Sequence, residues 1–274
     1  MPASLDQIVA ATRRKVAADR KAADLRQLDQ RAQIHVPRGF RRLLQAKART
    51  GPAIIAELKK ASPSRGLIRA DFDPARLAVE FERAGAAALS VLTETEFFQG
   101  SLQNLQSASA AATTLPCLRK DFIVDEFQVL EACAYAADAI LLIVAALTPS
   151  EITALARRAG EFGLDVLCEV HNETELRLAS DAGCDLIGVN NRDLRTLQVD
   201  LQTAFRLAGQ IPSHTLAIAE SGIRSATDLG RLRAAGYHAF LVGESLMQAK
   251  SPGEALQELL EADRSLALGR DATH

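Results

Sequence analysis

The stretch AIIAELKK at residues 53–60 is the first unit of a pattern that repeats through the rest of the 274-residue chain. A short β-prone apolar run ends in charged residues, and a loop and an Ala/Leu-rich helical stretch follow it. Nearly continuous apolar runs are typical of strands buried on both faces, as in a parallel sheet covered by helices. The predicted strands are Ala53–Leu58, Ala87–Leu92, Pro116–Arg119, Ala139–Ile143, Asp165–Val170, Leu186–Asn190, Leu216–Glu220 and Ala239–Val242.

Helix start and stop signals separate these strands. A capping residue before Pro or Glu marks each start, and an Ala-Gly pair marks several ends. The starts are Asp73-Pro74, Asp125-Glu126, Thr148-Pro149, Asn172-Glu173 and Ser251-Pro252, and the ends are Ala84-Gly85, Ala182-Gly183 and Ala235-Gly236. Eight βα units predict an α/β protein with a (β/α)8 TIM barrel. A doubly wound sheet is the alternative, but no G-x-G-x-x-G turn follows the first strand.

The first 50 residues lie outside this repeat. Residues 5–28 are Ala-rich, strongly charged and helical in propensity, and residues 41–48 predict another helix. Pro37 and Gly39 separate the two. We interpret residues 1–50 as an N-terminal helical extension packed on the barrel, with a solvated, non-catalytic role. Residues 51–274 then form the barrel, in a single structural domain.

Charge and hydropathy exclude several classes of protein. The chain has 32 Lys and Arg against 34 Asp and Glu, a formal net charge of −2, which argues against non-specific binding to nucleic acid or anionic membranes. The longest apolar run, residues 139–147, is too short to span a bilayer. Arg13, Arg14 and Lys15 interrupt the only candidate for a secretory signal. We therefore expect a cytoplasmic protein.

The cysteines and histidines form no recognisable site pattern. No C-x-x-C pair occurs, so we expect free buried thiols at Cys117, Cys133, Cys168 and Cys184. The histidines lack the spacing of metal ligands, so we predict no metal site; they are His35, His171, His214, His238 and His274.

Polar residues stand where the predicted strands end. Catalytic residues of barrel enzymes lie at the carboxyl ends of the strands. Burying several charges is costly unless they are paired or used in chemistry, so five polar strand ends predict one shared active site. Its candidate residues are Glu57, Lys59, Lys120, Glu169, Asn190, Arg192 and Glu220.

A second cluster follows the seventh and eighth strands, in Ser221-Gly222 and Gly243-Glu244. Glycines let backbone N–H groups approach an anion, a helix N-terminus adds a favourable dipole, and phosphate commonly binds at this place in barrels. We expect Glu244 to act through its backbone N–H, and a side chain at Gly243 to fill the volume of the phosphate. Ser62 adds a hydroxyl from the first loop.

Two aromatic residues follow the second and third strands. Phe98 and Phe122 are predicted to form an apolar slot for a flat substrate near the barrel mouth.

Taken together, these strand ends resemble the indole-3-glycerol-phosphate synthase family of tryptophan biosynthesis. The matching segments, in chain order, are IAELKKASPS at 55–64, LRKDF at 118–122, IGVNNRDL at 187–194, AESGI at 219–223 and LVGESLM at 241–247. The N-terminal extension and the loop at residues 96–100 are also similar to this family.

The resemblance implies a substrate and a reaction. The phosphorylated small molecule is 1-(2-carboxyphenylamino)-1-deoxyribulose 5-phosphate, which loses carbon dioxide and water as it cyclises to indole-3-glycerol phosphate. No step needs a redox cofactor or a metal. The resemblance implies Lys120 as the acid that protonates the ketone, which requires that burial or neighbouring cations lower its pKa.

The resemblance also implies the remaining roles. Glu169 is the expected base, with Glu57 as the alternative, and Lys59 steers the substrate carboxylate with Arg192 and serves as the acid for dehydration. Glu57 orients the lysines, and Asn190 and Glu220 hold substrate hydroxyls. The division of work between Lys59 and Lys120 stays open, as do the oligomeric state and any transient partner enzyme.

Three other functions compete with this interpretation. A Schiff-base lyase or aldolase would use Lys120 or Lys59 as nucleophile. A different phosphate-binding barrel, such as a sugar-phosphate isomerase, leaves the Lys59/Arg192 pair unexplained. A catalytically silent barrel serving as an interaction subunit predicts eroded strand ends, whereas those of this chain are intact.

Overall fold

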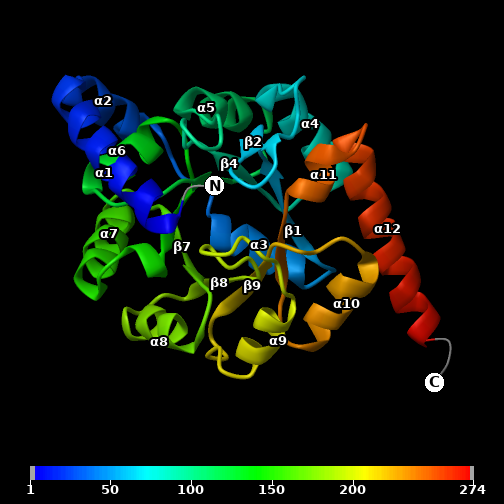
Figure 1. Ribbon diagram of the computed structural model, residues 1–274. Coiled ribbons are helices and arrows are strands. Elements are labelled where there is room, and N and C mark those ends of the chain that lie inside the picture. Colours follow the sequence, from blue (N-terminus) through cyan, green and yellow to red (C-terminus); the bar gives the residue numbers. More distant parts are fainter. Residues whose placement is uncertain (1–3, 272–274) are drawn as a thin grey trace.

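The predicted strands close into one parallel barrel in the computed structural model, which describes residues 4–271 (Figure 1). They are β1 (Ala53–Leu58), β4 (Ala88–Leu92), β5 (Cys117–Lys120), β6 (Ala139–Ile143), β7 (Asp165–Val170), β8 (Leu186–Asn190), β9 (Leu216–Glu220) and β10 (Ala239–Val242). β1 closes the ring by pairing with both β10 and β4. The (β/α)8 prediction is therefore confirmed. The predicted bounds were wrong by one residue at β4 and β5.

Helices follow the barrel strands and cover the outside of the barrel (Figure 1). They are α4 (Pro74–Ala84), α5 (Leu102–Ala111), α6 (Glu126–Ala134), α7 (Pro149–Glu161), α8 (Glu173–Asp181), α9 (Gln202–Ala208), α10 (Ala226–Ala234), α11 (Glu244–Gln248) and α12 (Pro252–Asp271), with a short 3-10 turn, η1 (Val144–Ala146). No described helix is long and apolar enough to cross a membrane.

The predicted capping residues begin these helices. The side chains of Asp73, Asp125, Thr148 and Asn172 each accept a hydrogen bond from a first-turn N–H. α12 starts at Pro252, as expected. Capping fixes where each helix leaves the loop and therefore how the loop crosses the barrel mouth.

The N-terminal extension folds into three helices, α1 (Leu5–Ala22), α2 (Leu25–Ile34) and α3 (Phe40–Ala48). The single helix expected over residues 5–28 was therefore wrong. The chain breaks there because the Asp24 side chain accepts a hydrogen bond from the Gln27 N–H at 3.1 Å and so starts α2.

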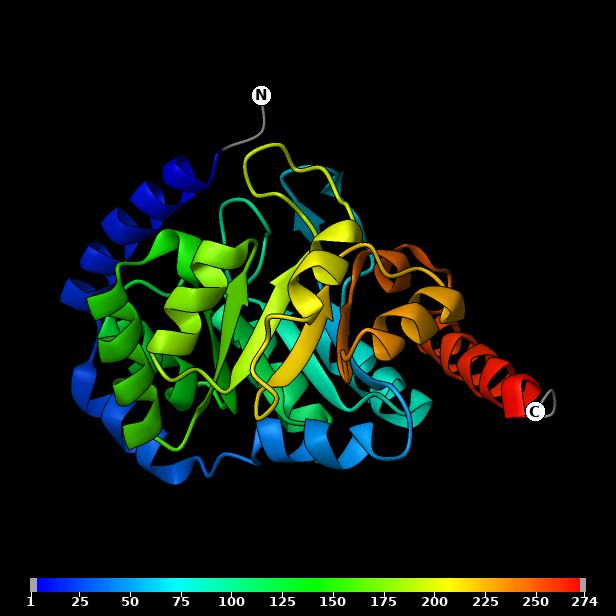
Figure 2. The ribbon, with the colours of Figure 1, turned by 90° about the horizontal axis from the view of Figure 1, so that it is seen from below.

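One end of the barrel is closed by α3, on the side away from the loops that follow the strands (Figure 2). Phe40 and Leu44 of α3 are fully buried against Ala53 and Ala239, the first residues of β1 and β10. The opposite end stays available for a site.

Alternate strand residues point into the barrel, and the inward positions change from apolar to charged toward the mouth. A buried inner layer contains Ile55, Leu118, Leu167 and Ile218. Two residues further along the same strands stand Glu57, Lys120, Glu169 and Glu220. The strand period therefore delivers four ionisable side chains to one end of one cavity.

A two-stranded hairpin, β2 (Ala61–Ser62) and β3 (Gly66–Leu67), follows β1 and was not predicted. Two-residue strands are too short to produce an alternating sequence pattern. The hairpin extends the first loop over the barrel mouth.

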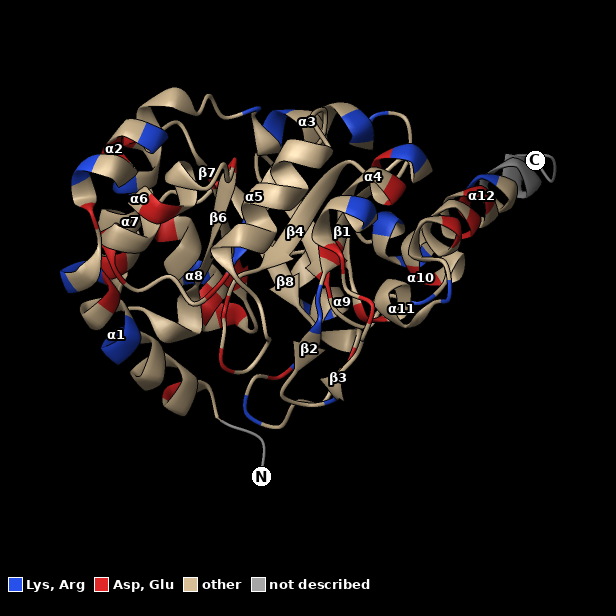
Figure 3. Ribbon diagram, turned by 90° about the horizontal axis from the view of Figure 1, so that it is seen from above, with Lys and Arg blue, Asp and Glu red and all other residues tan. Residues whose placement is uncertain are grey.

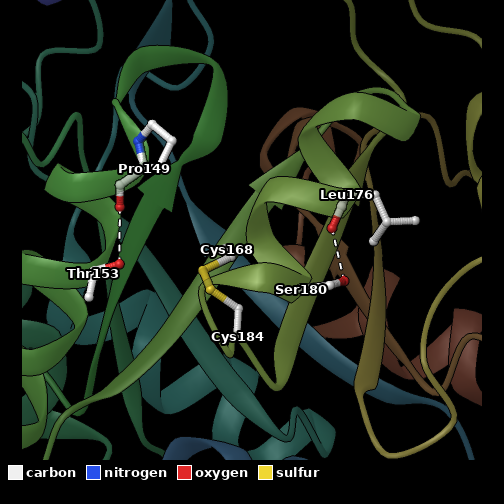
Figure 4. The surroundings of a disulfide bond; sticks show 6 residues. All are labelled: Pro149, Thr153, Cys168, Leu176, Ser180 and Cys184. Carbon is white, nitrogen blue, oxygen red and sulfur yellow. Dashed lines mark hydrogen bonds between the residues drawn. A yellow bond between two sulfur atoms is a disulfide. The ribbon is translucent and has the colours of Figure 1, made fainter.

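The expectation of four free thiols was wrong for one pair. Cys168 on β7 and Cys184 after α8 form a disulfide, with Cα atoms 6.5 Å apart (Figure 4). The sixteen-residue separation in sequence hides this contact, because the β7–α8–β8 crossover brings the two residues together. Cys117 and Cys133 are free and buried, as expected. His274 lies outside the described residues.

Candidate active site

A cavity of about 480 Å³ opens at the carboxyl ends of the barrel strands. The predicted site residues that line it are Glu57, Lys59, Phe98, Lys120, Phe122, Glu169, Asn190, Arg192, Glu220, Ser221, Gly222, Gly243 and Glu244. Ser62 lines a smaller adjoining pocket of about 90 Å³. The two pockets share Lys59, Phe98 and Arg192 in their walls. The structure thus brings every predicted site residue to the same mouth.

The centre of the cavity is an ionic cluster from three strands. Lys120 Nζ donates to Glu169 Oε2 at 2.7 Å and lies 3.5 Å from Glu220 Oε2. Both carboxylates are 1 % exposed. Glu220 Oε1 has no hydrogen-bond partner among the described residues, and Gly188 on β8 leaves the space it occupies. This oxygen is buried against the backbone of β8.

The charges around Lys120 contradict the expectation that its pKa is lowered. Burial by itself lowers the pKa of this lysine, but the charges of Glu169, Glu220 and Glu57 outweigh burial and hold the pKa above its ordinary value. The expectation that neighbouring cations lower the pKa was wrong, because its neighbours are carboxylates. Lys120 is therefore a protonated ammonium group before substrate enters.

The pKa values of the two carboxylates beside Lys120 are shifted in opposite directions. Burial raises the pKa of Glu169, but the charge of Lys120 and the proximity of His171 outweigh it, and the pKa lies well below the usual range. Burial and the charge of Glu169 raise the pKa of Glu220 to about 8, although the charge of Lys120 lowers it. At neutral pH, Glu169 is the ionised member and Glu220 is largely protonated.

Glu57 and Lys59 form a separate pair on β1 and just beyond it. Lys59 Nζ donates to Glu57 Oε1 at 2.5 Å, and both side chains are largely buried. Because Lys59 also lines the smaller pocket, its ammonium group lies between the two cavities. Glu57 therefore contacts Lys59 directly and acts on Lys120 only through its charge.

Gly243 leaves space for a neighbouring side chain. A Cβ at this position would collide with the Glu57 carboxylate and lie 2.8 Å from Glu57 Cβ. A larger residue there would displace Glu57, so the glycine keeps space for the Glu57–Lys59 pair. That Gly243 also keeps space for a phosphate stays a prediction.

The loop after β9 has an unusual backbone. Ser221 and Gly222 both have positive φ, 63° and 83°. A Cβ on Gly222 would lie 2.7 Å from Val199 Cγ1, so this position excludes larger residues. A non-glycine residue with positive φ is strained, and such strain is concentrated at functional sites. Both residues of the turn line the cavity.

The start of α11 supplies further backbone donors. Its first residue follows Gly243, and no side chain caps this end. The Glu244 carboxylate is engaged elsewhere, with Arg65 Nε at 3.1 Å and Arg192 Nη2 at 3.1 Å. The sequence did not single out Arg65, because its position on the hairpin between β2 and β3 depends on an unpredicted turn. Its ion pair ties that hairpin to α11.

Asn190 and Arg192 are joined at the end of β8. The Arg192 N–H donates to Asn190 Oδ1 at 3.0 Å, and Arg192 Nη1 donates to the Leu197 carbonyl at 3.1 Å. Asn190 is buried and lines the cavity. Both residues are therefore held in place before a ligand binds.

An apolar wall completes the mouth. The rings of Phe98 and Phe122 have centroids 6.3 Å apart and are tilted by 44°. Leu5 and Ile8 of α1 line the smaller pocket beside them. Most of α1 is exposed, as expected of the extension, but these two residues also make it part of the pocket wall.

Several known proteins are similar to this chain in sequence or in fold. The indole-3-glycerol phosphate synthase family model matches residues 5–259. A protein of Koribacter versatilis named indole-3-glycerol phosphate synthase is 56% identical over 260 residues, covering 95% of this chain and 100% of the relative. A protein of the same name from Aromatoleum aromaticum is 47% identical, covering 93% and 98%. Among solved structures, a 3-hexulose-6-phosphate synthase superposes with a TM-score of 0.63 at 14% identity, covering 77% of this chain and 99% of that one, which shows the shared fold alone.

Proposed function

Since the chain belongs to the indole-3-glycerol phosphate synthase family, carboxy-lyases of tryptophan biosynthesis, we propose how its residues divide the work of that reaction. The substrate is 1-(2-carboxyphenylamino)-1-deoxyribulose 5-phosphate. The observation that supports the assignment best is the 2.7 Å contact between Lys120 and Glu169 at the centre of the cavity. It joins a proton donor and a proton acceptor in one buried pair.

The substrate fits the cavity in one direction. Its phosphate lies at the backbone N–H groups of Ser221, Gly222 and the first turn of α11, where the loops after β9 and β10 meet. Its aryl ring lies against Phe98 and Phe122. The ketone between these two ends then reaches Lys120.

Ring closure requires an acid at the ketone. The aryl carbon that bears the carboxylate attacks the ketone carbon, and the ketone oxygen becomes an alkoxide that takes a proton from Lys120. An alkoxide is a stronger base than an amine, so Lys120 donates even with a raised pKa. The carboxylate then leaves as carbon dioxide, and its bonding electrons restore the aromatic ring.

Dehydration requires an acid and a base. Lys59 protonates the departing hydroxyl, which leaves as water. Glu169 removes a proton from the methylene carbon between the nitrogen and the carbon that loses the hydroxyl, so that the C=C bond of the indole ring forms and the nitrogen keeps its proton. The proton on Glu169 then returns to neutral Lys120 across their 2.7 Å contact, which restores the starting pair. Lys59 regains its proton from solvent at the cavity mouth. One proton is consumed overall, as loss of carbon dioxide and water from a carboxylate substrate requires.

The remaining polar groups hold the substrate. Asn190 and Glu220, which both line the cavity, hydrogen-bond the sugar hydroxyls. A largely protonated Glu220 also leaves Glu169 as the ionised carboxylate in contact with Lys120. Arg192 and Lys59 attract the substrate carboxylate, in competition with Glu244 and Glu57.

The protein acts on a small molecule in the cytoplasm without binding nucleic acid. Charges of both signs support this proposal, since Lys and Arg alternate with Asp and Glu over the helices (Figure 3). A formal net charge of −2 gives little long-range attraction for a polyanion.

A turnover assay tests the function. The purified protein and the substrate are mixed, and formation of the indole ring is followed by fluorescence. Borohydride added with substrate separates the two lysine chemistries. A covalent adduct on Lys120 or Lys59 would support a Schiff-base enzyme, whereas product formation without an adduct supports the acid role.

A further inference from the structure

His171 stands directly behind the base Glu169. It comes two residues after Glu169, just beyond β7, and Nε2 lies 3.3 Å from Glu169 Oε1. This contact is an ion pair rather than an aligned hydrogen bond, because Nε2 makes none with the described residues. Since Lys120 contacts Oε2, each oxygen of Glu169 faces one cation.

The other side of the imidazole is held by Glu175. Nδ1 lies 2.9 Å from Glu175 Oε2, and the His171 backbone N–H donates to the same oxygen at 2.8 Å. The Glu175 carboxylate is fixed in turn by Asn172, whose Nδ2 donates to Glu175 Oε1 at 2.6 Å. A chain of polar contacts therefore runs from the cap of α8 to the centre of the active site.

Both ring nitrogens of His171 face carboxylate oxygens. The doubly protonated imidazolium is the form that presents an N–H to a carboxylate on each side. In that form Nε2 already carries a proton and cannot accept one from Glu169. This excludes a proton relay through the ring and leaves an electrostatic and positioning role.

His171 does not touch the substrate cavity. It lines a separate hollow of about 340 Å³ between α8 and α9. The charged groups around it are Glu169 on β7, Glu173, Glu175 and Arg177 on α8, Asp193 after β8 and Arg206 on α9. Of these, Glu169 and Glu175 contact the ring.

We propose that His171, clamped by Glu175, is a positioning residue that holds the Glu169 carboxylate in place and neutralises it while Lys120 is deprotonated. This rests on the proposed function, in which Lys120 gives up its proton before Glu169 acts. At that moment Lys120 is neutral and His171 is the cation left in contact with Glu169. Losing the imidazolium charge then slows the dehydration step and leaves substrate binding largely unchanged.

Glu175→Gln tests this role through the pH dependence of kcat. Burial lowers the pKa of His171, but Glu169 and Glu175 outweigh burial and raise it to about 10. Without the Glu175 charge the imidazolium titrates nearer neutrality. We expect kcat of the variant to stay within about threefold of wild type at pH 6 and to fall at least tenfold by pH 8.5, with KM little changed.

The matched control is Asp181→Asn, which removes a charge of the same sign from an exposed residue at the other end of α8, outside this hollow. It should follow the wild-type profile. His171→Gln should lower kcat at both pH values, and this loss should disappear in a Glu169→Gln background. A Glu175→Gln profile parallel to wild type, or a His171→Gln loss that persists without Glu169, would overturn the proposal.

A second measurement does not depend on turnover. An NMR titration of the His171 ring, assigned with His171→Gln, should give a pKa at least one unit lower in Glu169→Gln and in Glu175→Gln than in wild type. An unchanged pKa in both variants would contradict the clamp. If the clamp is present but wild type forms no indole product, the proposed function fails and the His171 contacts stand.

Discussion

Lys120 Nζ and Glu169 Oε2 lie 2.7 Å apart, so the proposed acid and base of the reaction contact each other before any substrate is bound. The Glu169 carboxylate raises the pKa of Lys120, and the Lys120 ammonium group lowers the pKa of Glu169. The lysine is therefore kept protonated and the glutamate ionised. This arrangement explains how one proton can leave Lys120 early in the cycle and return from Glu169 at its end.

Lys120→Met should lower kcat by about 10²–10⁴, the usual contribution of general acid catalysis. The fold should survive, because neither carboxylate is left as an unpaired buried charge. Glu169 still forms its ion pair with His171, and Glu220 is largely protonated without the lysine. The measurement is steady-state turnover with a thermal melt beside it, and Lys250→Met serves as an exposed control. A folded variant within tenfold of wild type would remove Lys120 from the acid role.

Glu169→Gln should lower kcat severely with a smaller change in KM. The amide keeps the size of the side chain but cannot accept a proton. Steady-state kinetics at pH 7 separate the two parameters. If only KM rises, Glu169 binds substrate and the base is to be sought at Glu57.

Glu220 should make the stability of the protein depend on pH. Its pKa is raised from 4.5 in the unfolded chain to about 8 in the folded one. The folded state therefore binds the extra proton between these values, and stability present below pH 4.5 is lost as pH rises toward 8. Each pH unit in this window costs up to about 1.4 kcal/mol.

Thermal melts of wild type and Glu220→Gln at pH 5 and pH 8 measure this effect. The amide does not titrate, so the wild type should lose stability relative to the variant as pH rises. Glu258→Gln, an exposed substitution, should keep a constant difference from wild type. Parallel curves for wild type and Glu220→Gln would show that Glu220 is ionised throughout.

Gly243→Ala should lower kcat and stability together. The added methyl group overlaps the Glu57 side chain, and overpacking of this kind costs about 1–3 kcal/mol. The displaced Glu57 no longer holds Lys59, so turnover falls. Kinetics and a thermal melt check this; a stable variant with unchanged kcat and only a raised KM would show that Gly243 acts through phosphate binding alone.

The disulfide predicts a thiol count. Alkylation of the unfolded, unreduced protein should label Cys117 and Cys133 alone, and reduction should expose Cys168 and Cys184 as well. Peptide mass spectrometry identifies the labelled residues. Labelling of all four without reductant would mean that the pair exists as two thiols.

The sequence predicted the barrel because each strand is a nearly continuous apolar run with a cap or a glycine at the adjoining helix. It also located Lys120, Glu169 and Glu220, because strands of period two carry them to the mouth two residues after an inward apolar side chain. These features are local: each can be recognised within one strand and its adjoining helix.

What the sequence could not predict depends on contacts between segments. The sign of the charge around Lys120 is set by residues from β1, β7 and β9. The contact that a Cβ at Gly243 would make with Glu57 depends on how β10 lies beside β1. The contribution of α1 to the pocket wall depends on where Leu5 and Ile8 pack. None of these follows from spacing along the chain.

The most direct test of the account is the stoichiometry of one reaction in wild type and in Lys120→Met. Substrate labelled in its carboxyl group is incubated with each protein, and labelled carbon dioxide and indole-3-glycerol phosphate are measured together. The account predicts one carbon dioxide for each indole product in wild type, and a parallel loss of both, by at least a hundredfold in rate, in the variant. Wild type that releases neither, or a folded Lys120→Met that releases both at the wild-type rate, would contradict it.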